Sequence, residues 1–420
     1  MQAAGSTKIT KKQGTAFLAA WLGWAFDGLD GFMYGLVALP FIHQLLGKTS
    51  ATPFDAADKS KAALIQCVFL IGWALGGAVF GRLGDKWGRA KTLNLTILFY
   101  ACFTGLSAIS TEWWHLLIFR FLAALGIGGE WAAGAALVSE TLHKKHRYLG
   151  GAILQSGYMA GMLMASLASK LIHEPRMVFL VGVLPAFATI WIRKAVKEPE
   201  EWSGAKEKEE TPPISALFAP SVIKTTLKVL VMSSITLCGA WTILFFAPQL
   251  IQTHPDVKGH FKPTEVADMV FWLTITYTLW NIGGNFLSAF LTRYVGFRKG
   301  FAIMLTGALI VFVYGFSQPR SVDEYRIWVT AAAFFGLGVF GAFPLYFPTL
   351  FPTLLRTTGA GFCYNFGRII TAIGIFAAGS LREPRMGFMY VGFLYVIVIL
   401  LAFTMPEMKH YEEDQLAVGG

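Results

Sequence analysis

Between two long apolar stretches the chain reads Gly81-Arg82-Leu83-Gly84-Asp85-Lys86-Trp87-Gly88-Arg89-Ala90-Lys91. Residues 61–82 on one side and 91–110 on the other each reach the length of about 20 residues that a helix needs to cross a bilayer. Glycine lets two such helices approach closely and turn tightly, while Asp85 and Arg89 can hydrogen-bond helix ends at the membrane surface. The segment therefore predicts a tight connection between two membrane helices.

Apolar stretches of this length recur along the whole chain. Hydrophobic residues make up 55% of its 420 positions and charged residues only 14%, against about a quarter in soluble proteins. The pattern predicts an all-α membrane protein with twelve transmembrane helices. We expect them at residues 16–46, 61–82, 91–110, 114–139, 149–171, 177–195, 225–251, 266–292, 300–317, 327–350, 358–380 and 386–405.

The basic residues predict the orientation of the chain. Roughly twice as many Lys and Arg lie on one set of loops as on the other, which predicts cytoplasmic N- and C-termini. Because these charges are scattered over short loops, contact with a lipid bilayer explains the net charge of +10 better than binding of nucleic acid. The four cysteines lie inside predicted spans without close pairing, so we expect packing residues rather than disulfides or metal ligands.

The sequence repeats itself at an offset of about half its length. Glu174-Pro175-Arg176-Met177 returns as Glu383-Pro384-Arg385-Met386, in each case just before the last predicted span of a half. Arg89 corresponds in the same way to Arg298, and Arg147 to Arg356. Landmarks that share one offset predict two six-helix bundles related by an axis along the membrane normal.

The predicted bundles comprise residues 1–195 and residues 225–420, the second with a short cytoplasmic tail. Residues 196–224 between them are rich in charges and prolines and lack an apolar period. Such a composition is typical of a solvated linker, which we expect on the cytoplasmic side.

The loop at residues 81–91 resembles the signature loop of the major facilitator superfamily. With the twelve spans and the repeat, this resemblance implies that superfamily's fold and transport by alternating access. It also implies that the loop is a cytoplasmic latch, closed while the central cavity is open to the outside. The residues that the resemblance assigns to this gate are Gly81, Asp85, Gly88, Arg89, Glu140 and Arg147. A helix-end charge in water is the alternative for Glu140.

Two segments are similar to particular branches of the superfamily. Asp27-Gly28-Leu29-Asp30 resembles the Asp-Gly-x-Asp motif of aromatic-acid:proton symporters, and residues 120–131 resemble the fourth span of sialate and lactate:proton symporters. The resemblance implies a secondary active transporter of the bacterial inner membrane. It would take up a small organic anion, such as a monocarboxylate, aromatic acid or acid sugar, together with a proton. We expect it to act as a monomer without a cofactor.

Two carboxylates lie in the middle of the first predicted span. At about 1.5 Å per residue, Asp27 and Asp30 lie roughly 18 and 22 Å from its cytoplasmic start, and Arg120 lies about 20 Å from the same side. Ionisable residues at this depth mark ion or substrate routes. One cation cannot neutralise two acids, so we expect these three residues to couple proton movement, with the proton on either acid. A resemblance to proton-linked sugar porters of the superfamily, which keep an Asp at the matching place, implies Asp30 as the carrier. A structural ion network is the alternative. Glu130 falls nearer the cytoplasm, where we expect a structural role, with an inner proton relay as the alternative.

Arg368 lies close to the midplane in the eleventh span, with no acid obviously at its level. It is a natural counter-ion for a carboxylate ligand, which arginine can hold with two parallel hydrogen bonds. Pairing with backbone carbonyls or a distant acid is the alternative. Polar and aromatic residues on other spans complete the predicted substrate site: Tyr34, Gln155, Tyr158, Trp241, Tyr277, Asn281, Tyr364 and Asn365. Each of these alone could instead serve helix packing. Pro344 and Pro348 predict a kinked tenth span.

The sequence leaves other functions open. A proton-linked sugar or polyol porter would share the buried acids and arginine, but the paired glutamines that such porters place in the seventh span are missing from residues 233–239. A metabolite or drug:proton antiporter would use the same charges, and a membrane-embedded sensor would need an output domain. We find no nucleophile with a matched base, phosphate loop or metal-ligand cluster, so we expect neither an enzyme nor a metal site.

Overall fold

The computed structural model describes residues 10–49, 55–142, 144–172, 174–252, 254–258, 260–378 and 383–407. All regular elements in these ranges are helical. They are α1 (Lys11–Leu45), α2 (Ala56–Trp87), α3 (Arg89–Ala108), α4 (Trp113–Thr141), α5 (Lys144–Leu171), α6 (Pro175–Val181), α7 (Leu184–Ala195), α8 (Glu200–Lys208), η1 (Ile214–Phe218), α9 (Ile223–Gln252), α10 (Pro263–Val295), α11 (Phe297–Phe316), α12 (Val322–Ala332), η2 (Ala333–Leu337), η3 (Gly338–Ala342), α13 (Phe343–Thr349), η4 (Thr353–Leu355), α14 (Arg356–Ala378) and α15 (Pro384–Thr404).

Within the described residues, the predicted spans fall mostly on helical segments, and residues 379 and 380 of the span predicted at 358–380 lie outside the described part of the chain. Seven helical segments in the described part of the chain are long and apolar enough to cross a membrane. Large apolar side chains also cover much of the outer surface; Trp272, Phe290 and Leu400, for example, are 62%, 57% and 66% exposed. Such a surface is unfavourable in water and suits contact with lipid. The chain is therefore a multi-pass membrane protein.

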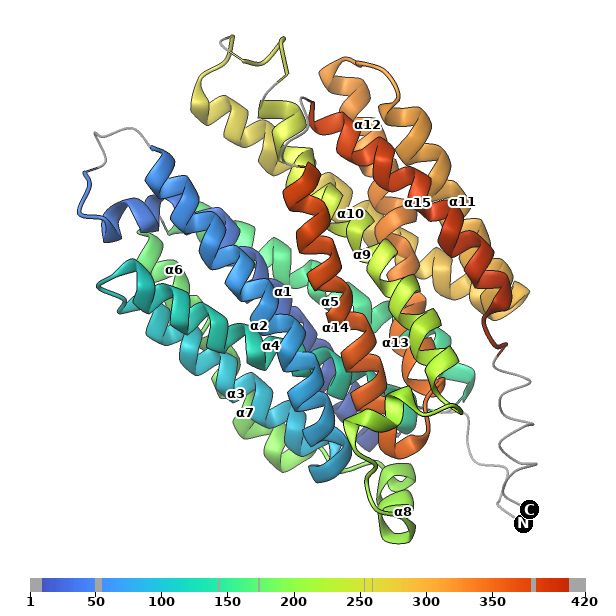
Figure 1. Ribbon diagram of the computed structural model, residues 1–420. Coiled ribbons are helices and arrows are strands. Elements are labelled where there is room, and N and C mark those ends of the chain that lie inside the picture. Colours follow the sequence, from blue (N-terminus) through green and yellow to red (C-terminus); the bar gives the residue numbers. More distant parts are fainter. Residues whose placement is uncertain are drawn as a thin grey trace.

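Figure 1 shows two groups of helices side by side. Helices α1 to α7, coloured blue to green, form one group, and α9 to α15, coloured yellow-green to red, form the other. The groups meet where α14 packs on α2 and α4, and where α10 packs on α5. The helices α2, α4, α5, α10 and α14 therefore form the contact between the groups.

Two kinds of hydrogen bond at helix ends occur in both groups of helices. The carboxylate of Glu198 accepts hydrogen bonds from the first backbone N–H groups of α3, and Glu407 does the same for α11. Arg176 donates to backbone carbonyls at the far end of α3, and Arg385 donates to those at the end of α11. These side chains satisfy helix ends that would otherwise leave buried polar groups unpaired.

The tenth predicted span contains the expected kink. Its helix is interrupted by the π-helical η2 and the 3-10 helix η3 before α13 begins. The interruption precedes Pro344 because proline has no N–H and its ring clashes with the carbonyl four residues earlier, here that of Phe340. Gly284 of α10 packs directly on this segment, since a Cβ atom there would lie 2.0 Å from the carbonyl oxygen of Phe334.

The predicted linker is less solvated than its composition suggests. It contains α8 and η1, and its side chains dock on the loop between α2 and α3. The indole of Trp202 is 9% exposed and donates to the carbonyl oxygen of Asp85 at 2.9 Å. Arg82 reaches from α2 to the carbonyl oxygen of Thr211 at 3.0 Å. A single tryptophan and a few polar bonds therefore anchor a segment without an apolar period.

The contact between α1 and α5 provides a test of the packing. A Cβ atom at Gly161 would lie 1.8 Å from the carbonyl oxygen of Ala25, whereas one at Gly35 would meet nothing within 4 Å. We expect Gly161→Ala to lower the melting temperature of the purified protein, because overpacking costs about 1–3 kcal/mol. Gly35→Ala, the matched control in a helix, should leave it unchanged or raised. Equal melting temperatures for the two variants would contradict the close packing.

Candidate functional site

The ion pair between Asp30 and Arg120 joins α1 to α4 in the buried interior. Arg120 Nη1 donates to Asp30 Oδ1 at 2.9 Å, and its Nη2 donates to the Asp30 backbone carbonyl at 3.2 Å. The hydroxyl of Thr104 on α3 donates to the same carboxylate oxygen at 2.6 Å. Both charged side chains are at most 1% exposed. A carboxylate with its own arginine and a hydroxyl donor is well stabilised as an anion.

Asp27 does not share this cation. None of the hydrogen bonds or ion pairs among the described residues joins Arg120 to Asp27, so the predicted arrangement of two acids around one arginine is corrected here. The reason is that two nitrogens of Arg120 already donate hydrogen bonds to Asp30, one to its carboxylate and one to its backbone carbonyl. Asp27 is completely buried, and both of its carboxylate oxygens lack a hydrogen-bond partner in the described structure.

Glu130 lies near Asp27, beside the preceding turn of α1. Its carboxyl fills the space against Gly23, where a Cβ atom would lie 2.1 Å from Glu130 Oε1. Side chains of a helix lean toward its N-terminus, so the Glu130 carboxyl reaches back toward the start of α4.

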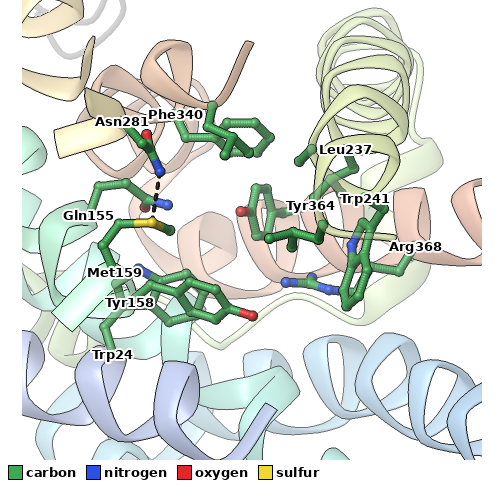
Figure 2. Close-up of a pocket in the computed structure, with 13 residues that line it drawn as sticks. Trp24, Gln155, Tyr158, Met159, Leu237, Trp241, Asn281, Phe340, Tyr364 and Arg368 are labelled. Atoms are coloured by element: carbon green, nitrogen blue, oxygen red, sulfur yellow. Dashed lines mark hydrogen bonds between the residues drawn. The ribbon is translucent and has the colours of Figure 1, made fainter. Parts of the chain in front are cut away.

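A narrow pocket with a cavity volume of about 50 Å³ lies between the two helix groups (Figure 2). Six residues of the predicted substrate site line it: Gln155, Tyr158, Trp241, Asn281, Tyr364 and Arg368. Apolar side chains complete the wall: Trp24, Met159, Leu237, Ala240, Leu244, Leu337 and Phe340. The pocket therefore combines a large apolar surface with a few polar groups, as ligand sites commonly do.

Arg368 provides the positive charge of the pocket. Its guanidinium group lies over the ring of Trp73 at 4.1 Å and over that of Tyr364 at 4.9 Å, and Asn365 Oδ1 accepts a hydrogen bond from its Nη1. No acidic side chain forms a salt bridge with it among the described residues, and its Nε has no partner there. Figure 2 shows the guanidinium and the Tyr158 hydroxyl pointing toward one another. The arginine is thus held in place while its charge stays available.

The other end of the pocket carries amides. Gln155 on α5 and Asn281 on α10 lie together on the side away from Arg368 (Figure 2). Asn281 donates to the sulfur of Met159, but its side-chain oxygen and that of Gln155 have no partner in the described structure. A buried acceptor without a donor is costly, so these oxygens are suited to accept hydrogen bonds from a bound molecule.

Three residues of the predicted substrate site lie outside the pocket lining. The Tyr34 hydroxyl donates to the Ala62 carbonyl at 3.0 Å, and its ring lies beside Arg120. Tyr277 is 1% exposed in the core. Asn365 accepts a hydrogen bond from Arg368 and donates to the carbonyl oxygen of Gly128 on α4 at 3.0 Å, so it affects the pocket through Arg368.

Several aromatic residues of the site were missed from the sequence. Trp73 lies over Arg368, Trp131 stacks on Tyr364 with ring centroids 4.0 Å apart, and Trp24 lies 4.9 Å from the Tyr158 ring. In the sequence of an apolar helix, an aromatic residue that faces a cavity cannot be distinguished from one that faces lipid. The signal that could have found Trp73 and Trp131 is their place on α2 and α4, opposite the helix of Arg368.

A second polar cluster closes one end of the space between the groups; we call it the Asp85–Arg89 cluster, with Glu140 as its third member. Arg89 bonds Asp85 Oδ1 at 2.9 Å and both oxygens of Glu140 at 2.9 and 3.1 Å. It also donates to the carbonyl of Thr353, while Asp85 accepts the backbone N–H of Thr358 at 2.8 Å. The cluster therefore ties α2, α3 and α4 to the start of α14.

The two predicted glycines of this cluster have different physical roles. Gly81 allows close approach, because a Cβ atom there would lie 2.9 Å from the carbonyl oxygen of Thr357. Gly88 forms the turn with φ of 116°, a region that favours glycine, and a Cβ there would meet the Glu198 carboxylate. Arg147 lies in the first turns of α5, and its side chain is outside the described part of the structure.

Comparison with solved structures shows the fold. The structure of the proton:xylose symporter XylE matches with a TM-score of 0.74 at 15% sequence identity, covering 95% of this chain and 97% of that one. The likeness at this identity concerns the fold alone.

Comparison with known sequences adds relatives of nearly full length. The chain is 28% identical to the sialic acid transporter NanX of Escherichia coli over 97% of its own length and 98% of the relative's. It is 25% identical to the cis,cis-muconate transport protein of Acinetobacter baylyi, with 95% and 96% covered. These relatives are transporters and not enzymes. A family model described as Major Facilitator Superfamily matches residues 20–358, so the chain belongs to the major facilitator superfamily of transporters.

Proposed function

We propose that this transporter takes up a small organic anion together with a proton. The observation that carries the proposal is Arg368, a buried cation that faces the pocket without a salt bridge to an acidic side chain in the described structure. Asp27 acts on it only through the electrostatic field. A substrate carboxylate can pair with the guanidinium through two parallel hydrogen bonds. A neutral sugar would bring no such counter-charge, which disfavours the alternative of a sugar or polyol porter.

The pocket also suggests the chemistry of the rest of the substrate. Gln155 and Asn281 offer unpaired acceptors opposite Arg368, and Trp24, Trp241 and Tyr364 offer ring faces between. An acid with hydroxyl or N–H groups at its other end, or with a flat unsaturated body, fits both features. The named substrates of the two relatives, sialic acid and cis,cis-muconate, are organic acids. Acid sugars and aromatic or unsaturated acids are therefore the substrate classes that we favour.

The proposed architecture is that of alternating access. Twelve spans would form bundles at residues 1–195 and 225–420, joined by the cytoplasmic linker 196–224, in a monomer in the bacterial inner membrane. The Asp85–Arg89 cluster would be the cytoplasmic gate, closed here by its bonds to Thr353 and Thr358. Rocking of the bundles about the pocket would then open and close the two sides in turn. The repeated helix caps of Glu198 and Glu407 support this division.

Proton coupling is proposed to reside in the acids of α1. Asp27 and Asp30 are at most 1% exposed, and both lie on α1, which contacts α4 and α5. An acid at this depth that binds and releases a proton can link the pH gradient to accumulation of the anion. An antiporter would use the same acids to move the proton in the direction opposite to that of the substrate. Symport is favoured because the substrate and the proton then bring charges of opposite sign into the buried site.

Substitution of Arg368 tests the anion site. We expect Arg368→Gln to weaken binding of sialic acid or cis,cis-muconate by about tenfold or more, because a charge-assisted bond contributes about 1.5–3 kcal/mol. Binding can be measured as thermal stabilisation of the purified protein by a panel of acids and neutral sugars. Arg293→Gln, at an exposed position on α10, is the matched control and should change nothing. Stabilisation by a neutral sugar that survives Arg368→Gln would favour the sugar-porter alternative.

Substitution of Gln155 tests the far end of the pocket. We expect Gln155→Leu to weaken binding of hydroxylated acids several-fold, since the unpaired acceptor is lost and the substrate hydroxyl is buried without a partner. Binding of an acid without hydroxyl groups should be retained in the same assay. Equal losses for both kinds of acid would show that Gln155 acts through packing.

Substitution of Asp85 tests the proposed gate. Asp85→Ala removes the acceptor of the first backbone N–H groups of α14, at Thr357 and Thr358. We expect faster hydrogen–deuterium exchange of these amides, as opening of this end becomes more frequent. The control is Asp323→Asn, at an exposed carboxylate. Unchanged exchange at Thr357 and Thr358 in the Asp85 variant would contradict the gate.

A further inference from the structure

Asp27 and Glu130 bring two carboxyl groups together in the buried interior without a cation between them. Both residues are completely buried, and none of their four carboxyl oxygens has a hydrogen bond of ordinary geometry to a described residue. The two carboxyls are close enough to repel each other, since Glu130 Oε1 lies against Gly23, one helical turn before Asp27. Gly23 makes room for this contact, since any side chain there would collide with Glu130 Oε1.

Asp30 is in a different chemical situation, although it lies one turn away on the same helix. Its carboxylate has the guanidinium of Arg120 at 2.9 Å and the hydroxyl of Thr104 at 2.6 Å. Removing a proton from Asp30 therefore leaves a compensated anion. Removing all protons from the Asp27–Glu130 pair would leave two adjacent negative charges in a region of low dielectric, which is strongly unfavourable. At least one proton is thus best placed between Asp27 and Glu130.

We propose that the Asp27–Glu130 pair carries the transported proton and that the Asp30–Arg120 ion pair holds α1 against α4. The inference rests on the proposed function, which it deepens by naming the carrier. The pair takes a proton from water on the outer side and returns it to water on the inner side, so no other reactant is needed. Because the two acids are coupled, the proton belongs to the pair and not to either residue alone.

The surroundings of the pair suggest how the proton is coupled to the anion. Charged and titratable groups that interact electrostatically with Asp27 come from five helices: Asp30 on α1, Tyr100 on α3, Glu130 on α4, Tyr158 on α5 and Arg368 on α14. Arg368 is the cation among them, and it also lines the pocket. In the empty site, its charge favours the ionised form of Asp27.

A bound anion changes this balance. When a carboxylate pairs with Arg368, the field of the guanidinium at Asp27 is largely cancelled, and the Asp27–Glu130 pair holds its proton more firmly. By reciprocity, a protonated pair leaves Arg368 free to bind the anion more tightly. Symport requires that the anion and the proton bind cooperatively. The binding site should change its exposure from one side of the membrane to the other only when it is empty or holds both.

Binding measured at several pH values tests the pair. With the protein in lipid nanodiscs and sialic acid or cis,cis-muconate as the probe, we expect wild-type affinity to rise about tenfold or more between pH 8 and pH 5. Asp27→Asn and Glu130→Gln remove an ionisable carboxyl, so no second negative charge can form. Their affinity should be the same at both pH values and close to that of the wild type at pH 5. Asp323→Asn, the exposed control, should keep the wild-type dependence.

Transport in proteoliposomes provides the second readout. The Asp27→Asn and Glu130→Gln variants should lose accumulation driven by an imposed pH gradient while retaining exchange of labelled for unlabelled substrate. Asp30→Asn should instead lower thermal stability, because it leaves Arg120 without its counter-ion. Retained exchange also shows that a variant is folded, and Glu130→Gln serves where Asp27→Asn fails to fold.

The outcomes separate this inference from the proposed function. If neither probe, nor any acid of the panel, binds the wild-type protein at any pH, the proposed function is wrong. If acids bind and both variants keep the wild-type pH dependence or gradient-driven accumulation, the proposed function stands and the Asp27–Glu130 inference is wrong. The inference is also wrong if binding requires sodium ions at the pair and is independent of pH in the wild type.

Discussion

A carboxylate away from water needs a cation, several hydrogen-bond donors or a proton, and the buried acids of this transporter depend on this requirement. Asp30 is stabilised by Arg120 and a threonine hydroxyl. Asp85 is stabilised by Arg89 and by the first amides of α14. Asp27 has neither, and the neighbouring group is another acid, Glu130. Three buried acids on two helices are thus placed in three different chemical environments.

These environments distinguish fixed contacts from contacts that can be exchanged. The bond between Asp30 and Arg120 joins helices of one group, so it can persist while the groups move. The bonds of Asp85 and Arg89 to Thr358 and Thr353 cross between the groups, so they must break when this end opens. Because α2 and α4 both take part in the crossing contact, opening is a movement of whole helices and not of a single loop.

The sequence predicted the elements and much of the pocket. Gln155, Tyr158 and Asn281 are polar or amphipathic residues at helical spacing in apolar spans, and such residues must face an interior. The latch role of residues 81–91 was expected from the resemblance to the superfamily's signature loop, and the charges of that loop do form a buried cluster. Arg368 was singled out as a cation deep in a span without an acid in its own helix.

The rest depended on side-chain reach and on contacts that leave no pattern in the sequence. The closeness of Glu130 to Asp27 was not foreseen, because residue counting locates Cα atoms while the carboxyl leans back toward the start of α4. Trp73 was missed because an apolar period does not distinguish a ring that stacks on an arginine from one that faces lipid. Trp202 was missed because a single buried tryptophan anchors α8 in a segment that is otherwise polar.

Asn365 joins Arg368, the proposed anion-binding residue, to the opposite group of helices. Its oxygen accepts a hydrogen bond from Arg368, while its nitrogen donates to the Gly128 carbonyl on α4 at 3.0 Å and to the Gly361 carbonyl of its own helix at 2.8 Å. The orientation of the guanidinium therefore depends in part on the contact of α14 with α4. If the groups separated there, Arg368 would lose part of its support. In the proposed transport cycle the affinity of the site would then fall as a direct result of the opening movement, so the cargo could leave without a separate ejection step.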